Sequence, residues 1–157
     1  MDKLKKFWKG KKVFVTGHTG FKGAWLTIFL NTLGAKVYGY SLKPLKNSLF
    51  NEAKIEKITK KNYFEDIKNY KKLKSAISDT KPQFIFHLAS QALVSEGYKN
   101  PYQNFSTNLN GTLNLLDILK NLKMSVSTLI VTTDKVYKNK NLNKKFKEVD
   151  ELGGVDP

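Results

Sequence analysis

The sequence has no cysteine and no arginine among its 157 residues. Without cysteine, the chain can form no disulfide, thiolate nucleophile or cysteine-ligated metal site. It also has no apolar run of about 18 residues, the length that a membrane-spanning helix needs. The N-terminal residues 1–8 carry lysines but no apolar segment of a secretory signal. These absences favour a cytoplasmic protein, and the two histidines, His18 and His87, are too few and too separate to indicate a metal site.

The missing arginine also bears on the charge. All 28 basic residues are lysines, and the formal net charge is +15. Such a charge suggests nucleic acid, but arginine is the usual bidentate ligand of bases and phosphates. The lysines are spread along the whole chain together with 14 asparagines, which is typical of background composition. We expect weak, salt-sensitive binding to polyanions, and neither a specific nucleic-acid partner nor a membrane partner.

The most informative pattern is a glycine-rich turn between an apolar strand, residues 12–16, and an apolar helix, residues 21–33. Gly17, Gly20 and Gly23 have the spacing G-x-x-G-x-x-G. In dinucleotide-binding folds the first glycine allows the tight turn, the second lets the backbone approach a pyrophosphate, and the third lets the helix pack on the strand. The helix N-terminus then favours the phosphates. An ordinary glycine-rich turn without a ligand is the alternative.

Strands and helices alternate beyond this turn. Further strands are expected at 36–40, 62–64, 84–88 and 129–131, helices at 68–78 and from Pro101 onward, and a polar loop at 138–147. This order predicts an α/β fold, a Rossmann-type doubly wound parallel sheet with helices on both faces, in one domain spanning residues 1–157.

The helix after Pro101 has apolar residues at steps of three or four. They are Phe105, Leu109, Leu113, Leu116, Leu119 and Leu122. We interpret this stripe as core-facing. Gly111 interrupts the helix, and we expect close packing there because glycine costs about 1 kcal/mol relative to alanine in a helix.

Several blocks together carry a family resemblance: residues 10–23, 48–50, 87–91, 107–112, 132–137 and 152–157. Through them nearly the whole chain resembles the extended short-chain dehydrogenase/reductases, in particular the NAD-dependent nucleotide-sugar epimerases and dehydratases. The triplet Thr133, Asp134 and Lys135 resembles members that act on CDP-glucose, whereas members that act on dTDP-glucose have Thr-Asp-Glu.

The resemblance implies a cytoplasmic lyase with NAD as cofactor and CDP-glucose as substrate. It also implies a place in deoxysugar biosynthesis for lipopolysaccharide O-antigen and a homo-oligomer in the complete enzyme. Two alternatives stay open: another nucleotide-sugar epimerase or dehydratase, and a non-catalytic NAD-binding or interaction fragment.

The resemblance also assigns contacts to the cofactor. The residues implied at the pyrophosphate are Gly17, Thr19, Gly20, Phe21 and Lys22, and Gly23 belongs to the same cofactor-binding turn. Those implied at the adenine edge are Asp66 and Ile67, those implied on the nicotinamide side are Leu88, Ala89 and Gln91, and Asn108 is implied near the active site. Each polar residue among them could instead be a cap or a loop contact.

Three residues match the family's catalytic positions. Thr133 matches the threonine that hydrogen-bonds the C4 oxygen of the sugar, and Asp134 matches the acid for the departing hydroxyl. Asp134 also follows a parallel strand, where such folds place their sites, although a turn cap is its alternative. Lys135 stands where relatives have a glutamate base. It is interpreted as a base, a substrate contact or an ordinary exposed lysine.

One position departs from the usual dinucleotide site. An Asp or Glu is expected about 20 residues after the glycine turn, for the ribose hydroxyls. Here Ser41 stands after the second strand, followed by Lys43 and Lys46. Ser41 could accept that hydrogen bond, and the lysines could favour a 2′-phosphate. NAD is the expected cofactor by resemblance, and NADP is not excluded.

In the family, the block ending at Pro157 runs directly into a Tyr-x-x-x-Lys motif, which is absent here. We therefore expect an incomplete domain, truncated before the last strands and the substrate domain, and inactive alone. The one spacing match, Tyr70 with Lys74, falls in an expected surface helix.

Overall fold

The computed structural model describes residues 1–123, 125–138 and 145–153, with only the backbone of Asp134. Most of the expected 138–147 loop and of the last motif block therefore lies outside the described residues. The strands are β1 (Lys12–Thr16), β2 (Lys36–Ser41), β3 (Lys61–Phe64), β4 (Phe84–His87) and β5 (Ser127–Ile130). They form a parallel sheet in the order β3-β2-β1-β4-β5.

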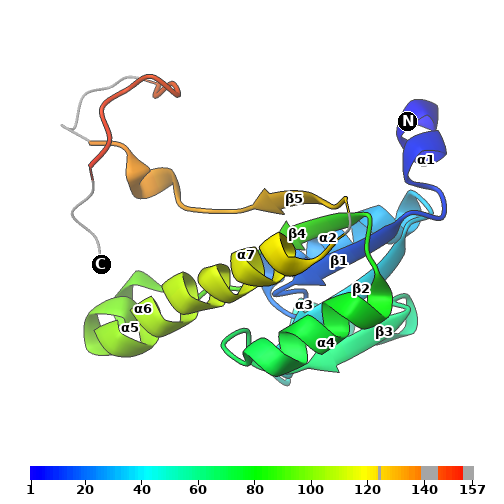
Figure 1. Ribbon diagram of the computed structural model, residues 1–157, viewed down its shortest axis with the longest axis horizontal. Coiled ribbons are helices and arrows are strands. Elements are labelled where there is room, and N and C mark those ends of the chain that lie inside the picture. The colour runs from blue at the N-terminus through cyan, green and yellow to red at the C-terminus, as the bar shows by residue number, and fades with distance from the viewer. Residues whose placement is uncertain (124, 139–144, 154–157) are drawn as a thin grey trace.

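Helices cover both faces of this sheet, as expected for a Rossmann-type fold. The α-helices are α1 (Asp2–Trp8), α2 (Phe21–Thr32), α3 (Leu49–Glu52), α4 (Tyr70–Thr80), α5 (Val94–Lys99), α6 (Pro101–Phe105) and α7 (Gly111–Asn121). Short 3-10 turns, η1 (Ile55–Lys57) and η3 (Asp134–Val136), and a π-helical segment, η2 (Ser106–Asn110), complete the fold. In Figure 1, α4 and α7 lie on one side of the sheet and α2 on the other.

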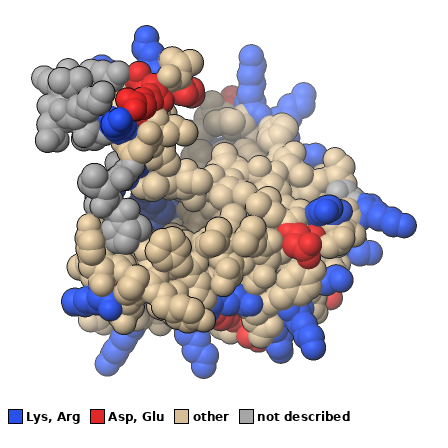
Figure 2. Space-filling view, turned by 60° about the vertical axis from the view of Figure 1, so that its left-hand side comes forward, with Lys and Arg blue, Asp and Glu red and all other residues tan. Residues whose placement is uncertain are grey.

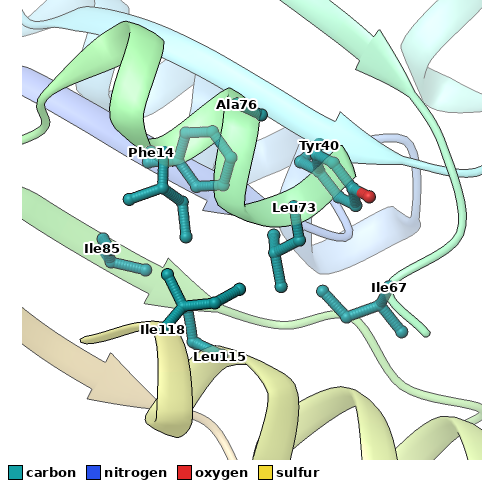
Figure 3. Close-up of a cluster of buried hydrophobic side chains, with 9 residues drawn as sticks. Phe14, Tyr40, Ile67, Leu73, Ala76, Ile85, Leu115 and Ile118 are labelled. Carbon is teal, nitrogen blue, oxygen red and sulfur yellow. The ribbon is translucent and has the colours of Figure 1, made fainter. Parts of the chain in front are cut away.

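The larger core lies under α4 and α7 (Figure 3). Leu73 and Ile77 of α4 and Leu115 and Ile118 of α7 are fully buried against the strands. Gly111 begins α7 where a Cβ would lie 2.7 Å from Cγ2 of Ile67. The expected close packing at this glycine is therefore confirmed, and it fixes α7 over the loop that follows β3.

The opposite face is covered mainly by α2, which packs Leu30 onto Val13, Val15 and Val37. The helix ends as its sequence indicates, because Gly34 has φ +84° and its N–H bonds to the carbonyl of Asn31. This conformation suits glycine, which lacks the Cβ that penalises positive φ. Beyond α2, aromatic rings of α1 partly cover β4 on this face.

The interpretation of the long apolar stripe is wrong in part. Leu119 and Leu122 pack against the core, but Phe105, Leu109, Leu113 and Leu116 are about half exposed. The core face of α7 is instead formed by Leu115 and Ile118, one step round the helix. The stripe therefore leaves an apolar surface exposed along this helical segment.

The strand β5 is an edge of the described sheet, with β4 as its neighbour. Ser127, Thr128 and Leu129 are exposed, so this edge is more open than the rest of the sheet. Within the described ranges, no helix is long and apolar enough to cross a membrane. Figure 2 shows lysines around the margin of one face, with no single basic patch over its described centre.

Candidate cofactor and substrate site

The glycine turn has the geometry that its spacing predicts. Gly17 has φ +72°, and its N–H bonds to the carbonyl oxygen of Tyr40 at 2.8 Å. A Cβ at Gly17 would lie 2.8 Å from backbone atoms of Leu88 and Ala89. A Cβ at Gly23 would collide with the Gly17 carbonyl oxygen. Both glycines are therefore required by packing, which brings the ends of β1 and β4 together.

Gly20 differs from these two, because the space around it is open. A Cβ there would meet, among the described atoms, only the Gly17 carbonyl oxygen at 3.4 Å. Gly20 is also the N-cap of α2, and no described side chain caps this helix. The first N–H groups of α2 are thus free of side-chain caps and lie next to this open space. A bound pyrophosphate in this fold needs such N–H groups as hydrogen-bond donors.

His18 is a structural residue of the turn. Its ring is buried between Phe50 and Phe64, and its Nε2 lies 2.9 Å from Oδ1 of Asn62. The ring occupies the place where a side chain at Gly39 would be, so β2 needs a glycine there. Burial lowers the pKa of His18 to about 4. The neutral ring of His18 therefore packs between the glycine turn and strands β2 and β3.

The predicted adenosine end of the site lies where β2 ends. The hydroxyls of Thr19 and Ser41 are 2.8 Å apart, and Thr19 also donates to the carbonyl oxygen of Leu42. Beside them, Asp66 Oδ1 accepts the N–H of Lys68 at 2.9 Å. Ile67 is buried in the core, so only its backbone is available to a ligand. The adenine-edge role of this pair stays a prediction.

A partly buried hydrogen-bond chain links the ends of β1 and β4 to the start of α7. Thr16 Oγ1 accepts the N–H groups of Leu88 and Ala89 at 3.1 Å and lies 2.8 Å from Nδ1 of His87. His87 Nε2 lies 3.2 Å from Thr112 Oγ1, whose own hydroxyl donates to the carbonyl of Asn108. Burial lowers the pKa of His87 to about 4. The chain fixes the segment after β4, which is the predicted nicotinamide side.

Asn108 holds the same segment from the helix side. Its Oδ1 accepts the Gln91 N–H at 2.7 Å, and its Nδ2 donates to the Gln91 carbonyl and to Asn104 Oδ1. Asn108 lies in the π-helical segment η2, and such segments are frequent at functional sites. Asn104 was missed from the sequence, although its spacing of four residues from Asn108 places both on one helix face.

A cavity of about 790 Å³ opens beside these groups. It brings together six of the predicted site residues: Lys22, Ala89, Gln91, Asn108, Thr133 and Lys135. Further lining residues that the sequence did not reveal are Ser90, Ala92, Leu93, Val94, Asn104, Thr112, Ile130, Val131 and Thr132, together with His87. The other predicted cofactor residues are not among those that line it. Phe21 is 73% exposed on α2.

The predicted catalytic triplet follows β5, and Thr133 and Lys135 line this cavity. Thr133 is the N-cap of η3, and its Oγ1 accepts the N–H of Lys135 at 3.1 Å. Asp134 begins that turn, and its side chain lies outside the described part of the structure. Both readings of Asp134, as the acid and as a turn cap, therefore stay predictions. A capping hydroxyl still has its own proton to donate.

Comparison with known proteins identifies the family of this chain. The sequence model of the GDP-mannose 4,6 dehydratase family matches residues 14–157. A CDP-glucose 4,6-dehydratase of Salmonella typhimurium is 40% identical over 154 residues, which are 98% of this chain and 43% of that enzyme. A UDP-glucose 4-epimerase of Mycoplasma genitalium is 29% identical over 80% of this chain and 37% of its own length.

Solved structures show the same fold. A Stenotrophomonas maltophila UDP-glucose-4-epimerase with bound NAD superposes with a TM-score of 0.77 at 22% identity, over 93% of this chain and 44% of that one. The chain thus spans less than half the length of these relatives. It belongs to the GDP-mannose 4,6 dehydratase family, among nucleotide-sugar epimerases and dehydratases.

Proposed function

We propose that the chain forms the NAD-binding part of a cytoplasmic nucleotide-sugar dehydratase, a lyase that acts on CDP-glucose. The observation that carries the proposal is the glycine turn, with open space over Gly20 and an uncapped α2. The 40% identity with the Salmonella CDP-glucose 4,6-dehydratase, over nearly the whole chain, supports the substrate.

The residues present fit a dinucleotide. The turn from Gly17 to Gly23 would hold the pyrophosphate at the start of α2, where free N–H groups and the helix dipole favour an anion. Thr19 and Ser41 would hold the adenosine ribose. The segment after β4, fixed by Asn108, would form the nicotinamide side. NAD would supply a hydride acceptor for oxidation at C4 of the sugar and return the hydride after water is lost.

The triplet after β5 would handle the protons of the sugar. Thr133 would donate its hydroxyl proton to the C4 oxygen, since its lone pair already accepts the Lys135 N–H. Asp134 would protonate the hydroxyl that leaves C6 as water. Lys135 lines the cavity and would either accept the C5 proton or bind the substrate. A lysine acts as a base at neutral pH only when desolvation or a neighbouring cation lowers its pKa.

The isolated chain would lack turnover under this proposal, because its sequence does not contain the family's Tyr-x-x-x-Lys after the Gly-Gly-x-Asp-Pro block. Tyr70 and Lys74 cannot replace that pair. They lie on α4, and the Tyr70 hydroxyl donates to Asp117 Oδ2 at 2.7 Å on the helix surface. Under this proposal, the tyrosine that takes the sugar-hydroxyl proton would come from outside these 157 residues.

Calorimetric titration of the chain with ADP-ribose and with NAD tests the proposal. We expect measurable binding of ADP-ribose, with NAD no more than about tenfold tighter, because half of the nicotinamide site is missing. Absence of binding for both ligands would contradict a cofactor site. Much tighter NAD binding would show that the described half already completes the nicotinamide site.

A further inference from the structure

Three carboxamide side chains line the cavity, those of Gln91, Asn104 and Asn108. Two of them are committed to the loop after β4. The side-chain nitrogen of Gln91 donates to the carbonyl oxygen of Leu93 at 2.9 Å. The side-chain nitrogen of Asn108 donates both to the Gln91 carbonyl oxygen and to Asn104 Oδ1. Asn104 differs from both, because its side-chain nitrogen has no acceptor among the residues that the structure describes.

The orientation of the Asn104 amide follows from a backbone group. The Gln91 N–H can only donate, so the Asn108 atom that it contacts at 2.7 Å is the oxygen Oδ1. The other end of that amide, Nδ2, is then a donor, and the Asn104 atom that it contacts at 2.8 Å is again the oxygen. The Nδ2 of Asn104 therefore lies on the other side of its amide and still has both protons to donate.

This nitrogen belongs to a buried residue of the cavity wall. Asn104 lies on α6, is only 8% exposed, and lines the cavity together with Thr133 and Lys135. A donor that is removed from water and left without an acceptor destabilises the fold, so nearly all such groups in proteins are paired. We therefore expect a ligand in the cavity to supply the acceptor.

The cavity wall favours a sugar as this ligand. An amide is a neutral donor that suits a hydroxyl oxygen, whereas phosphates are usually bound by lysines or helix N-termini. Leu93 and Val94 line the same cavity and offer apolar surface to the C–H groups of a hexose. Under the proposed function, Thr133 contacts the C4 oxygen and Asp134 the C6 hydroxyl. The hydroxyls that are left for Asn104 are those at C2 and C3.

We propose that Asn104 binds the hexose of the nucleotide sugar, with its Nδ2 donating to the oxygen of the C2 or C3 hydroxyl. Its Oδ1 at the same time holds Asn108, which bonds to both backbone groups of Gln91. One amide thus contacts the sugar and supports the segment on the predicted nicotinamide side. This inference rests on the proposed function, because it concerns the substrate of the same cavity.

The test uses the complete enzyme, in which this chain is joined to the downstream part of the Salmonella CDP-glucose 4,6-dehydratase. The value of kcat/KM is measured for CDP-glucose and for its 2-deoxy and 3-deoxy analogues. In the parent enzyme, one of the two analogues should lose about tenfold or more, because it leaves the Asn104 nitrogen unpaired. In Asn104→Leu, kcat/KM for CDP-glucose itself should fall by about tenfold, and the same analogue should lose less than about threefold further.

Asn31→Leu is the matched control. Asn31 is also a partly buried helix amide, whose nitrogen donates to the carbonyl oxygen of Ile58 at 3.0 Å, but it is not among the residues that line the cavity. This variant should keep the parent's ratio of kcat/KM between CDP-glucose and each analogue.

Two results would overturn the inference and leave the proposed function intact. One is a full further loss of about tenfold for the sensitive analogue in Asn104→Leu, which would show that the two losses are independent. The other is a loss below about threefold for both analogues in the parent enzyme, a measurement that does not depend on the folding of any variant. A folded, NAD-binding complete enzyme that forms no product from CDP-glucose would instead contradict the proposed function, and this inference with it.

Discussion

The hydroxyl of Thr16 lies 2.8 Å from Nδ1 of His87, and this contact joins the ends of β1 and β4. Because Thr16 Oγ1 already accepts the N–H groups of Leu88 and Ala89, its own proton goes to His87 Nδ1. His87 is then the tautomer with its proton on Nε2, which faces Thr112. One threonine thus positions the backbone of Leu88 and Ala89, on the predicted nicotinamide side.

We therefore expect Thr16→Val to destabilise the fold by about 2 to 4 kcal/mol, since it leaves two N–H groups and a histidine nitrogen without their partner. Urea unfolding followed by circular dichroism measures the change. Thr32→Val is the matched control, because Thr32 is exposed and, among described groups, donates only to the carbonyl of Ile28. Loss of this hydrogen bond should lower the free energy of unfolding by less than about 1 kcal/mol. Equal costs for both variants would show that the Thr16 contact does not hold the two strand ends.

Stability should fall as the pH drops from about 6.5 toward 4. Burial lowers the pKa of His18 and of His87 to about 4, whereas both titrate near 6.5 in the unfolded chain. Between these two pKa values the unfolded state binds more protons than the folded state. The contribution of each neutral histidine to the free energy of unfolding is therefore fully present above pH 6.5. Up to about 3 kcal/mol of it per histidine is lost as the pH falls toward 4.

Urea midpoints measured from pH 7.5 down to pH 5 test this expectation before most carboxylates protonate. A His87→Gln variant, which cannot gain that proton, should show a shallower decline. A profile that is flat in the parent chain would mean that the two rings are accessible to solvent.

The glycines of the turn should separate binding from folding. Gly20→Ala should leave the fold intact, because a Cβ there meets little beyond the Gly17 carbonyl oxygen at 3.4 Å. It should weaken the binding of ADP-ribose by about tenfold or more, since the methyl occupies the space where the pyrophosphate approaches.

Gly23→Ala should instead reduce the stability of the fold, because its methyl collides with Gly17. Calorimetry and thermal unfolding distinguish the two, and an unchanged ADP-ribose affinity in Gly20→Ala would place the phosphates elsewhere.

Self-association should follow from the exposed apolar stripe and the open edge at β5. Leu109, Leu113 and Leu116 are 45–54% exposed along one side of the helix, and Leu129 on β5 is 51% exposed. Such surfaces favour association. We expect light scattering to find oligomers or aggregates, and Leu113→Glu to reduce them without unfolding. The control Leu115→Glu, at a buried neighbouring position, should unfold the chain. A clean monomer with a sharp thermal transition would contradict this expectation.

The features that the sequence predicted are those set by local patterns. The glycine turn and the five strands depend on residues close in the chain, and each predicted strand or helix bound lies within about two residues of the observed one. The direction of the α7 stripe was not predictable in this way. Spacing shows that Leu113 and Leu116 share a face, but the neighbouring Leu115 faces the core because of where α4 and the sheet lie.

The hydrogen-bond chain was missed for a similar reason. Thr16, His87 and Thr112 come from three separate segments, and the contacts of His87 with Thr16 and with Thr112 span 71 and 25 residues of sequence. The π-helical segment that turns Asn108 toward Gln91 also has no signature that we identified in the sequence. Such features arise only when the strands are assembled, so their roles depend on the three-dimensional structure.

The most direct test of the central claim is a chimera in which this chain replaces the matching N-terminal part of the Salmonella CDP-glucose 4,6-dehydratase. With NAD present, the chimera should convert CDP-glucose to the 4-keto-6-deoxy sugar, while the isolated chain should form no product. Asp134→Asn is the control within the chimera: it should slow water loss more than the first hydride transfer, so NADH absorbance should persist during a single turnover. A folded, NAD-binding chimera that forms no 4-keto-6-deoxy product from CDP-glucose would contradict the account.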